Sequence, residues 1–135
     1  MAGNLTNIGE KLALNLLFRN TGTPPTDIYL GLATGKIEDS DDLSTITEED
    51  DQAYSRQKVT FTAPGNNGEG ATEIINNEAI KFGPWDADAD NDITYAFFVD
   101  DQDRLLTWFK LPQPKAPTSG EPMEVPLNEL IFDID

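Results

Sequence analysis

The chemistry that this sequence offers is that of carboxylates. Asp and Glu supply 25 of the 135 residues, Lys and Arg supply nine, and the sequence contains neither His nor Cys. Without His and Cys there is no serine–histidine triad, no cysteine nucleophile and no thiolate metal site. The enzyme class that remains is a carboxylate-only hydrolase with paired acids, as in glycosidases. Acid pairs arise by chance at this acid content, so we expect no catalytic residue and no cofactor.

The most regular acid spacing is that of Asp86, Asp88 and Asp90, three carboxylates that alternate in a way that would let them turn toward a calcium ion. The run begins like an EF-hand loop. However, Asn91 stands where that loop requires glycine, and Phe97 stands where it requires a bidentate glutamate. These three aspartates are therefore weak metal candidates, and we expect an acidic loop without a bound metal.

The acidic run leads into the most apolar stretch of the chain, residues 93–111. Two runs rich in β-branched and aromatic residues, 93–99 and 105–111, flank a short polar segment, which predicts a β-hairpin. Each run is apolar on both faces, and alternation places Leu105, Phe109 and Leu111 on one face. A strand that is apolar on both faces must be covered on both, so we expect this hairpin in the middle of a sheet that packs against a second layer.

A helix is expected over about residues 5–19, where apolar residues recur at helical spacing. Its stripe consists of Leu5, Ile8, Leu12 and Leu16, widened by Leu17. Asn7 with Glu10 forms a weak capping box, and Thr6 is an alternative cap. So short a helix is not stable alone in water and must pack on its own sheet or on a neighbouring subunit. Leu5, Ile8 and Leu12 are therefore candidate partner contacts.

The rest of the chain alternates short strand patterns with turn clusters. Residues 35–52 differ, because eight acids surround the apolar anchors Ile37, Leu43 and Ile46. We expect this segment to be a solvated surface loop, with a partner-contacting loop and an ion site as the alternatives. The whole pattern predicts a mainly β protein, an antiparallel β-sandwich with one N-terminal α-helix. We expect a single domain over residues 1–135, with the sandwich beginning at about residue 27.

The net charge is −16, which repels nucleic acids and anionic membranes, so we expect neither as a partner. The start, Met-Ala-Gly-Asn, is not that of a signal peptide. Apolar runs in the sequence fall short of the roughly 18 residues of a membrane span. We therefore expect a soluble protein without an export signal.

In their order along the chain, these features resemble small virion structural proteins of tailed bacteriophages, of the tail-fibre-like or capsid-decorating type. The resemblance rests on the helical segment 4–18, the strand 28–34, the acidic loop, the segment 54–61, the strand 79–82 with Trp85 after it, and the hairpin.

That resemblance implies a non-enzymatic structural protein displayed on the outside of a virion and assembled in the host cytoplasm. It also implies contacts with other virion proteins, of the capsid or the tail, and with further copies of the chain. The sequence has no heptads or shaft repeats, so a capsid-decorating (cement) protein fits at least as well as a tail-fibre component.

The main alternative is a carbohydrate- or receptor-binding β-sandwich module, which would bind through exposed aromatic faces. The candidate aromatic residues are Trp85, Trp108, Tyr54 and Tyr29. Trp85 lies between Pro84 and Asp86 and is expected to be the most exposed of them, which also makes it the fourth candidate partner contact. The carboxylate-only hydrolase is the remote alternative.

Overall fold

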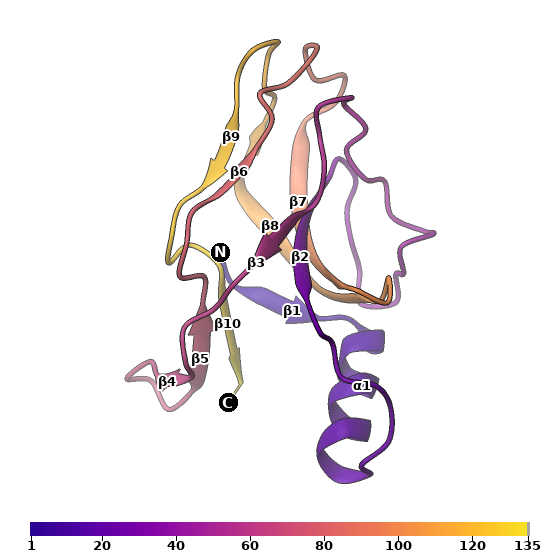
Figure 1. Cartoon of the computed structure of the whole chain (residues 1–135), viewed down its shortest axis with the longest axis vertical. Coiled ribbons are helices and arrows are strands. Elements are labelled where there is room, and N and C mark those ends of the chain that lie inside the picture. Colours follow the sequence, from indigo (N-terminus) through magenta and orange to yellow (C-terminus); the bar gives the residue numbers. More distant parts are fainter. Residues whose placement is uncertain (135) are drawn as a thin grey trace.

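A computed structural model describes residues 1–134 as antiparallel β-sheets with one helix projecting from an end of the molecule (Figure 1). The main sheet has the strand order β1-β8-β7-β2-β3. Its strands are β1 (Gly3–Leu5), β2 (Ile28–Ala33), β3 (Gln57–Val59), β7 (Ile93–Asp100) and β8 (Leu105–Lys115). The protein is 38% strand and 9% helix, which confirms the prediction of a mainly β, antiparallel fold with one helix.

The apolar hairpin lies in the middle of this sheet, as predicted. β7 pairs with β8 on one side and with β2 on the other. Every residue of β7 except Thr94 is buried, because side chains on both faces meet other parts of the chain. The position of β7 therefore follows from its double apolar character.

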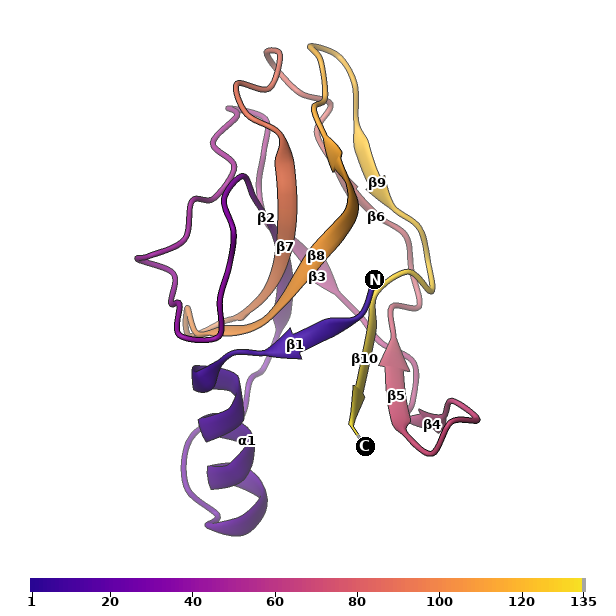
Figure 2. The ribbon, with the colours of Figure 1, turned by 180° about the vertical axis from the view of Figure 1, so that it is seen from behind.

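One face of the main sheet packs on a second layer (Figure 2). This layer contains two smaller sheets, with strand orders β6-β9 and β10-β5-β4. Their strands are β4 (Gly65–Asn66), β5 (Thr72–Ile75), β6 (Ile80–Phe82), β9 (Met123–Val125) and β10 (Ile131–Ile134). The shared core joins Phe98 and Phe109 of the main sheet to Phe82 and Val125 of the second layer. This packing gives the molecule its sandwich-like arrangement.

Residues 35–52 form a surface loop, as predicted, and the apolar anchors of this loop also cover the opposite face of the main sheet. Ile37 is 1% exposed, and it packs with Leu43 and Ile46 against Phe97 and its neighbours. These residues form a second hydrophobic core, on the side of the main sheet away from the second layer. Many acids of the segment still face solvent. The three apolar anchors are enough to turn an acidic loop into a cover for the sheet.

A polar network fixes the end of this cover. The Arg56 guanidinium donates to both carboxylate oxygens of Glu48, from Nε at 2.9 Å and from Nη2 at 2.8 Å. The Tyr54 hydroxyl donates to Glu48 at 2.7 Å and accepts the backbone N–H of Leu32 at 2.9 Å. Burial, reinforced by the Glu48 carboxylate, raises the pKa of Tyr54, so this hydroxyl stays a donor. The network ties the acidic segment to β2.

Two register shifts between β7 and β8 change which face some side chains occupy. One shift lies between Ile93 and Tyr95, the other between Phe98 and Val99. As a result Leu105 joins the core under the acidic segment, whereas Phe109 joins the opposite core. The predicted placement of these two residues on one face was wrong, because a β-bulge breaks strict alternation.

Ile37→Ala should lower the free energy of unfolding by about 2–5 kcal/mol, because it removes a buried side chain and leaves a cavity over the main sheet. Urea unfolding of the purified protein measures this change. The neighbouring Lys36, whose side chain is 69% exposed, provides the control. Lys36→Ala should change the free energy by no more than about 0.5 kcal/mol. Equal effects of the two substitutions would mean that the acidic segment does not cover the sheet.

Candidate interaction site at the N-terminal helix

The helix α1 (Asn7–Phe18) is joined to the main sheet through its cap residue, Thr6. The Thr6 hydroxyl accepts the backbone N–H of Gly9 at 3.0 Å and donates to the carbonyl oxygen of Leu105 at 2.6 Å. Its backbone N–H donates to the Leu106 carbonyl oxygen at 2.9 Å. Of the two caps that the sequence offered, Thr6 is the one used. One buried threonine therefore both starts the helix and fixes it to β8.

Gly9 allows α1 to approach β8 closely. It is the buried residue of the helix, and a Cβ added there would lie 2.3 Å from the Leu106 carbonyl oxygen. Any side chain at this position would push the first turn away from the strand. Beyond this turn the helix extends away from the sheets (Figure 2). No helix within residues 1–134 is long and apolar enough to cross a membrane.

An apolar cleft of about 240 Å³ lies between α1 and the strands. We call it the α1 cleft. It is lined by Leu5, Gly9, Leu12, Ala13, Leu16, Ile28, Phe61, Ile74, Phe98, Leu106, Thr107 and Phe132. The composition of this lining is that of a protein core, yet the helix does not close against the strands. The cleft is therefore an opening into which apolar groups can enter.

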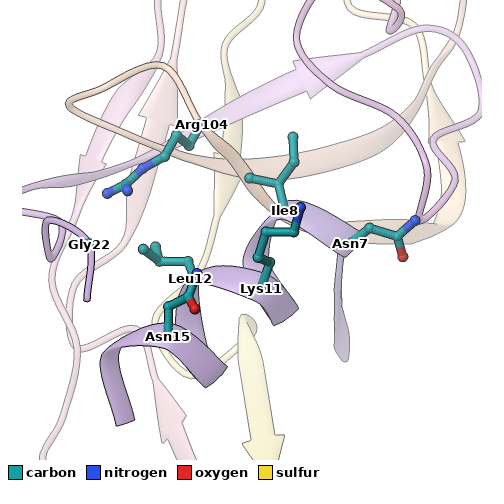
Figure 3. Close-up of a pocket in the computed structure, with 7 residues that line it drawn as sticks. All are labelled: Asn7, Ile8, Lys11, Leu12, Asn15, Gly22 and Arg104. Atoms are coloured by element: carbon teal, nitrogen blue, oxygen red, sulfur yellow. The ribbon is translucent and has the colours of Figure 1, made fainter. Parts of the chain in front are cut away.

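A second cavity, of about 310 Å³, lies between α1, the segment that follows it and the β7–β8 turn. Figure 3 shows its lining. Ile8, Lys11 and Leu12 of the helix lie near Arg104, the residue just before β8. The Arg104 guanidinium is already engaged, because it donates to Asp100 at 2.8 Å from Nε and to the Thr23 carbonyl oxygen at 2.7 Å. Because Arg104 already bonds to groups of its own chain, it contributes little charge for binding an outside ligand in this cavity.

The structure places three of the four predicted contact residues around α1. Leu5 was expected on the helix, and this was wrong, because it ends β1, which pairs with β8 in the main sheet before the helix begins at Asn7. Leu5, Ile8 and Leu12 are all half-buried. Leu5 and Leu12 line the α1 cleft, and Ile8 lines the second cavity with Leu12. They border open apolar space without being sealed into a core. Their role as partner contacts remains a prediction, and the cleft gives it a location.

The expectation that Trp85 would be exposed was wrong. Its side chain is 2% exposed and packs in the core between the main sheet and the second layer. Its backbone N–H donates to the Glu121 carbonyl oxygen at 2.8 Å, and its carbonyl oxygen accepts the N–H of Gly120 at 2.8 Å. Gly120 and Glu121, which precede β9, thus hold the backbone of Trp85, and its buried ring cannot stack on a partner or a sugar.

α1 has a second apolar surface that was not predicted, formed by Leu14, Leu17 and Phe18. Their exposed fractions are 58%, 72% and 79%. Leu17 was assigned to the buried stripe, and the other two were not singled out. The spacing of these residues, i, i+3 and i+4, is itself a helical stripe and was the available signal. We call these three residues the outer stripe.

The acids of the Asp86 run take part in loop contacts. The Asp51 carboxylate accepts the backbone N–H groups of Asp86 at 3.0 Å and Ala87 at 3.1 Å, and Asp88 accepts the N–H of Ser119 at 2.8 Å. Asp90 lines an acidic pocket together with Asp51, Asp86 and Asp88. Within the described residues, 1–134, no group of three or more acidic side chains could hold a metal ion. That the chain works without a metal remains a prediction.

Thr6→Val should lower the free energy of unfolding by about 1–3 kcal/mol, because it removes the cap and leaves the N–H of Gly9 and the carbonyl of Leu105 with fewer partners. Thermal and urea unfolding measure this loss. Thr6→Ser keeps the hydroxyl and is the control, expected to retain most of the stability. A Thr6→Val variant as stable as the Thr6→Ser variant would contradict the role given to the hydroxyl.

The pH dependence of stability should change in Asp51→Asn. The N–H of Asp86, followed by those of Ala53 and Ala87, lowers the pKa of Asp51 below its ordinary value of 3.8. A folded-state pKa below the unfolded one means that the carboxylate adds stability above about pH 4, which is lost as the pH falls through the folded pKa. We expect the variant to lose less stability than the wild type between about pH 4 and pH 2.

Urea midpoints measured across this pH range test that expectation. Asp50→Asn, which removes the same charge at the exposed neighbouring position, is the control. Parallel pH profiles for the wild type and Asp51→Asn would show that the Asp51 contacts add no pH-dependent stability.

Comparison with known proteins identifies the family. No curated protein is significantly similar to the chain. The family model for podophage GP4 fiber I protein gp80 matches residues 4–133. The match runs from β1 through α1 and the sheets into β10, and it confirms the resemblance to small virion structural proteins of tailed phages. The chain therefore belongs to the podophage GP4 fiber I protein gp80 family.

Proposed function

We propose that this chain is a non-enzymatic fibre component displayed on the outside of a tailed-phage particle, attached to the tail and not to the capsid. The observation that carries the proposal is the match of residues 4–133 to the family of a fibre protein. Family membership makes the chain a structural component of a virion that contacts other virion proteins. The sequence left capsid and tail open, and a fibre family favours the tail.

The distribution of charge supports external display. The chain carries a net charge of −16, and many of the acids in residues 35–52 face solvent. Such a surface favours solubility and repels the phosphates of packaged nucleic acid. The acidic surface formed by residues 35–52 is thus suited to face outward, and the helix with its apolar surfaces is suited to attachment. Assembly in the host cytoplasm and the presence of several copies on the particle belong to the same proposal.

The absence of catalysis is also part of the proposal. The sequence lacks His and Cys, and a hydrolase would have to use its acids alone. Acids that come together, such as Asp51 with the Asp86 segment, accept backbone N–H groups in loop contacts. These contacts give the carboxylates a structural role.

The carbohydrate-binding alternative has lost its main residue, because Trp85 is buried. Trp108 is half-buried, and its Nε1–H donates to the Asp39 carboxylate at 2.8 Å, which holds the ring against the acidic segment. Sugar-binding sites need an open aromatic face that can stack on a pyranose ring. Neither tryptophan provides one, so structural attachment is the function that the geometry supports best.

Gold-labelled antibody against the purified chain should bind the tail region of particles of a phage that encodes it. Electron microscopy gives the position of the label, and antibody absorbed with the purified chain is the control. Label distributed over the head would reject tail attachment in favour of capsid decoration, and unlabelled particles would reject a virion role. Release of reducing sugar from polysaccharides by the purified chain would reject the non-enzymatic part of the proposal.

A further inference from the structure

We propose that the α1 cleft of one copy of this chain binds the outer stripe of α1 from a second copy. The inference deepens the proposed function, since it rests on the chain being a fibre component present in several copies, and it names the surface through which these copies associate.

The outer stripe is a surface that a folded monomer leaves in water. Leu14, Leu17 and Phe18 are 58%, 72% and 79% exposed, although each is a large apolar side chain. At about 3.6 residues per turn they lie on the side of the helix away from Gly9 and Leu12, which face the strands. A helix that is apolar on two opposite sides is normally covered on both. α1 has only 12 residues, so a second cover would add directly to its stability.

The α1 cleft has the size and lining to accept this stripe. Its volume is about 240 Å³, and Phe98 and Leu106 of the main sheet, with Ile74 and Phe132 of the second layer, contribute apolar walls. A cavity of roughly 150 Å³ with comparable walls takes up a benzene molecule. The cleft can therefore hold the ring of Phe18 together with part of a neighbouring leucine.

Charge argues that the occupant is another copy of this chain. Residues 1–26 contain Lys11, Arg19 and the single acid Glu10, a net charge of +1, which leaves −17 for residues 27–135. Two copies that met through their sheets would bring like charges together, whereas residues 1–26, which include α1 and Arg19, bring a charge of +1 to an acidic surface. Glu10, Asp39 and Asp133 line a cavity that shares Leu5 and Phe132 with the α1 cleft. The cleft thus has acids beside it for the cations of an incoming helix.

One contact of this kind explains two features at once, the unfilled cleft and the uncovered stripe. Each copy has both halves of the contact, so every copy can give its stripe to one neighbour and receive a stripe from another or from the same one. Leu5 and Leu12, predicted as partner contacts, lie in the receiving half.

Sedimentation equilibrium of the full chain over a concentration series, at about 0.15 M salt, tests the proposal. The wild type should associate. Phe18→Gln should raise the dissociation constant at least about 30-fold, as loss of a central interface residue does. Leu127 is 54% exposed and lies outside α1, and Leu127→Gln is the matched control, expected to change the constant by no more than about 2-fold. At protein concentrations low enough to keep all three proteins monomeric, the unfolding midpoints of both variants should stay near that of the wild type.

A complementation experiment separates this contact from other modes of association. Ala13 lines the α1 cleft, and Ala13→Leu should fill it from within and weaken self-association. Phe18→Gln retains an intact cleft, and Ala13→Leu retains an intact outer stripe. A mixture of the two variants should therefore associate more tightly than either variant alone.

Three results would overturn the proposal: a wild type that stays monomeric at every concentration, a Phe18→Gln variant that associates like the wild type, or a mixture that shows no gain. These results are independent of the antibody experiment. A monomeric chain that labels the tail would reject the second-copy contact and leave the fibre assignment standing. A self-associating chain that labels the head would reject tail attachment and leave the second-copy contact standing.

Discussion

The side chains of β7 alternate between two cores, one shared with the second layer and the other with residues 35–52. Both faces of this strand are apolar and buried, so each face of the sheet must be covered by another part of the chain. β6 and β9, with Trp85 and Leu130, provide the first cover, and three apolar anchors within an acidic segment provide the second. The hydrophobic effect acting on one strand thus accounts for why so acidic a chain forms a compact double-sided packing.

Parts of this fold that depend on local pattern were predictable from sequence. The hairpin that turns at residues 100–104 and the helix near its expected range both follow from hydrophobic periodicity. This periodicity is a property of the local sequence, so it can be read without knowing the fold. Trp85 was misjudged, because Pro84 and Asp86 suggested a turn at the surface, whereas Gly120 and Glu121, more than 30 residues later, bond to its backbone and the ring packs in the core between the two layers. Leu105 was placed on the wrong face, because a β-bulge depends on how two strands pair and leaves no mark in either strand's own alternation.

The same limit applies to the candidate site. Leu5, Ile8 and Leu12 were predicted as contact residues because a short helix needs a partner, and they do border open cavities. The outer stripe was missed, because Leu17 fits either stripe and only the crossing of Gly9 over the Leu106 carbonyl fixes the rotation of the helix. Hydrophobic periodicity shows that this helix has two apolar faces, but it does not show which of them is buried. A tertiary contact such as that of Gly9 with Leu106 decides this.

The acidic cover has a consequence for how the protein can change over evolutionary time. Its hold on the sheet depends on Ile37, Leu43, Ile46 and the Glu48 network, whereas positions such as Ser40, Thr47 and Asp50 face outward. Substitutions at those outward positions meet little packing constraint, so the outer surface can diverge between related phages while the sheet beneath it keeps its form. A fibre component built in this way has a tightly packed framework beneath an outer surface that tolerates substitution.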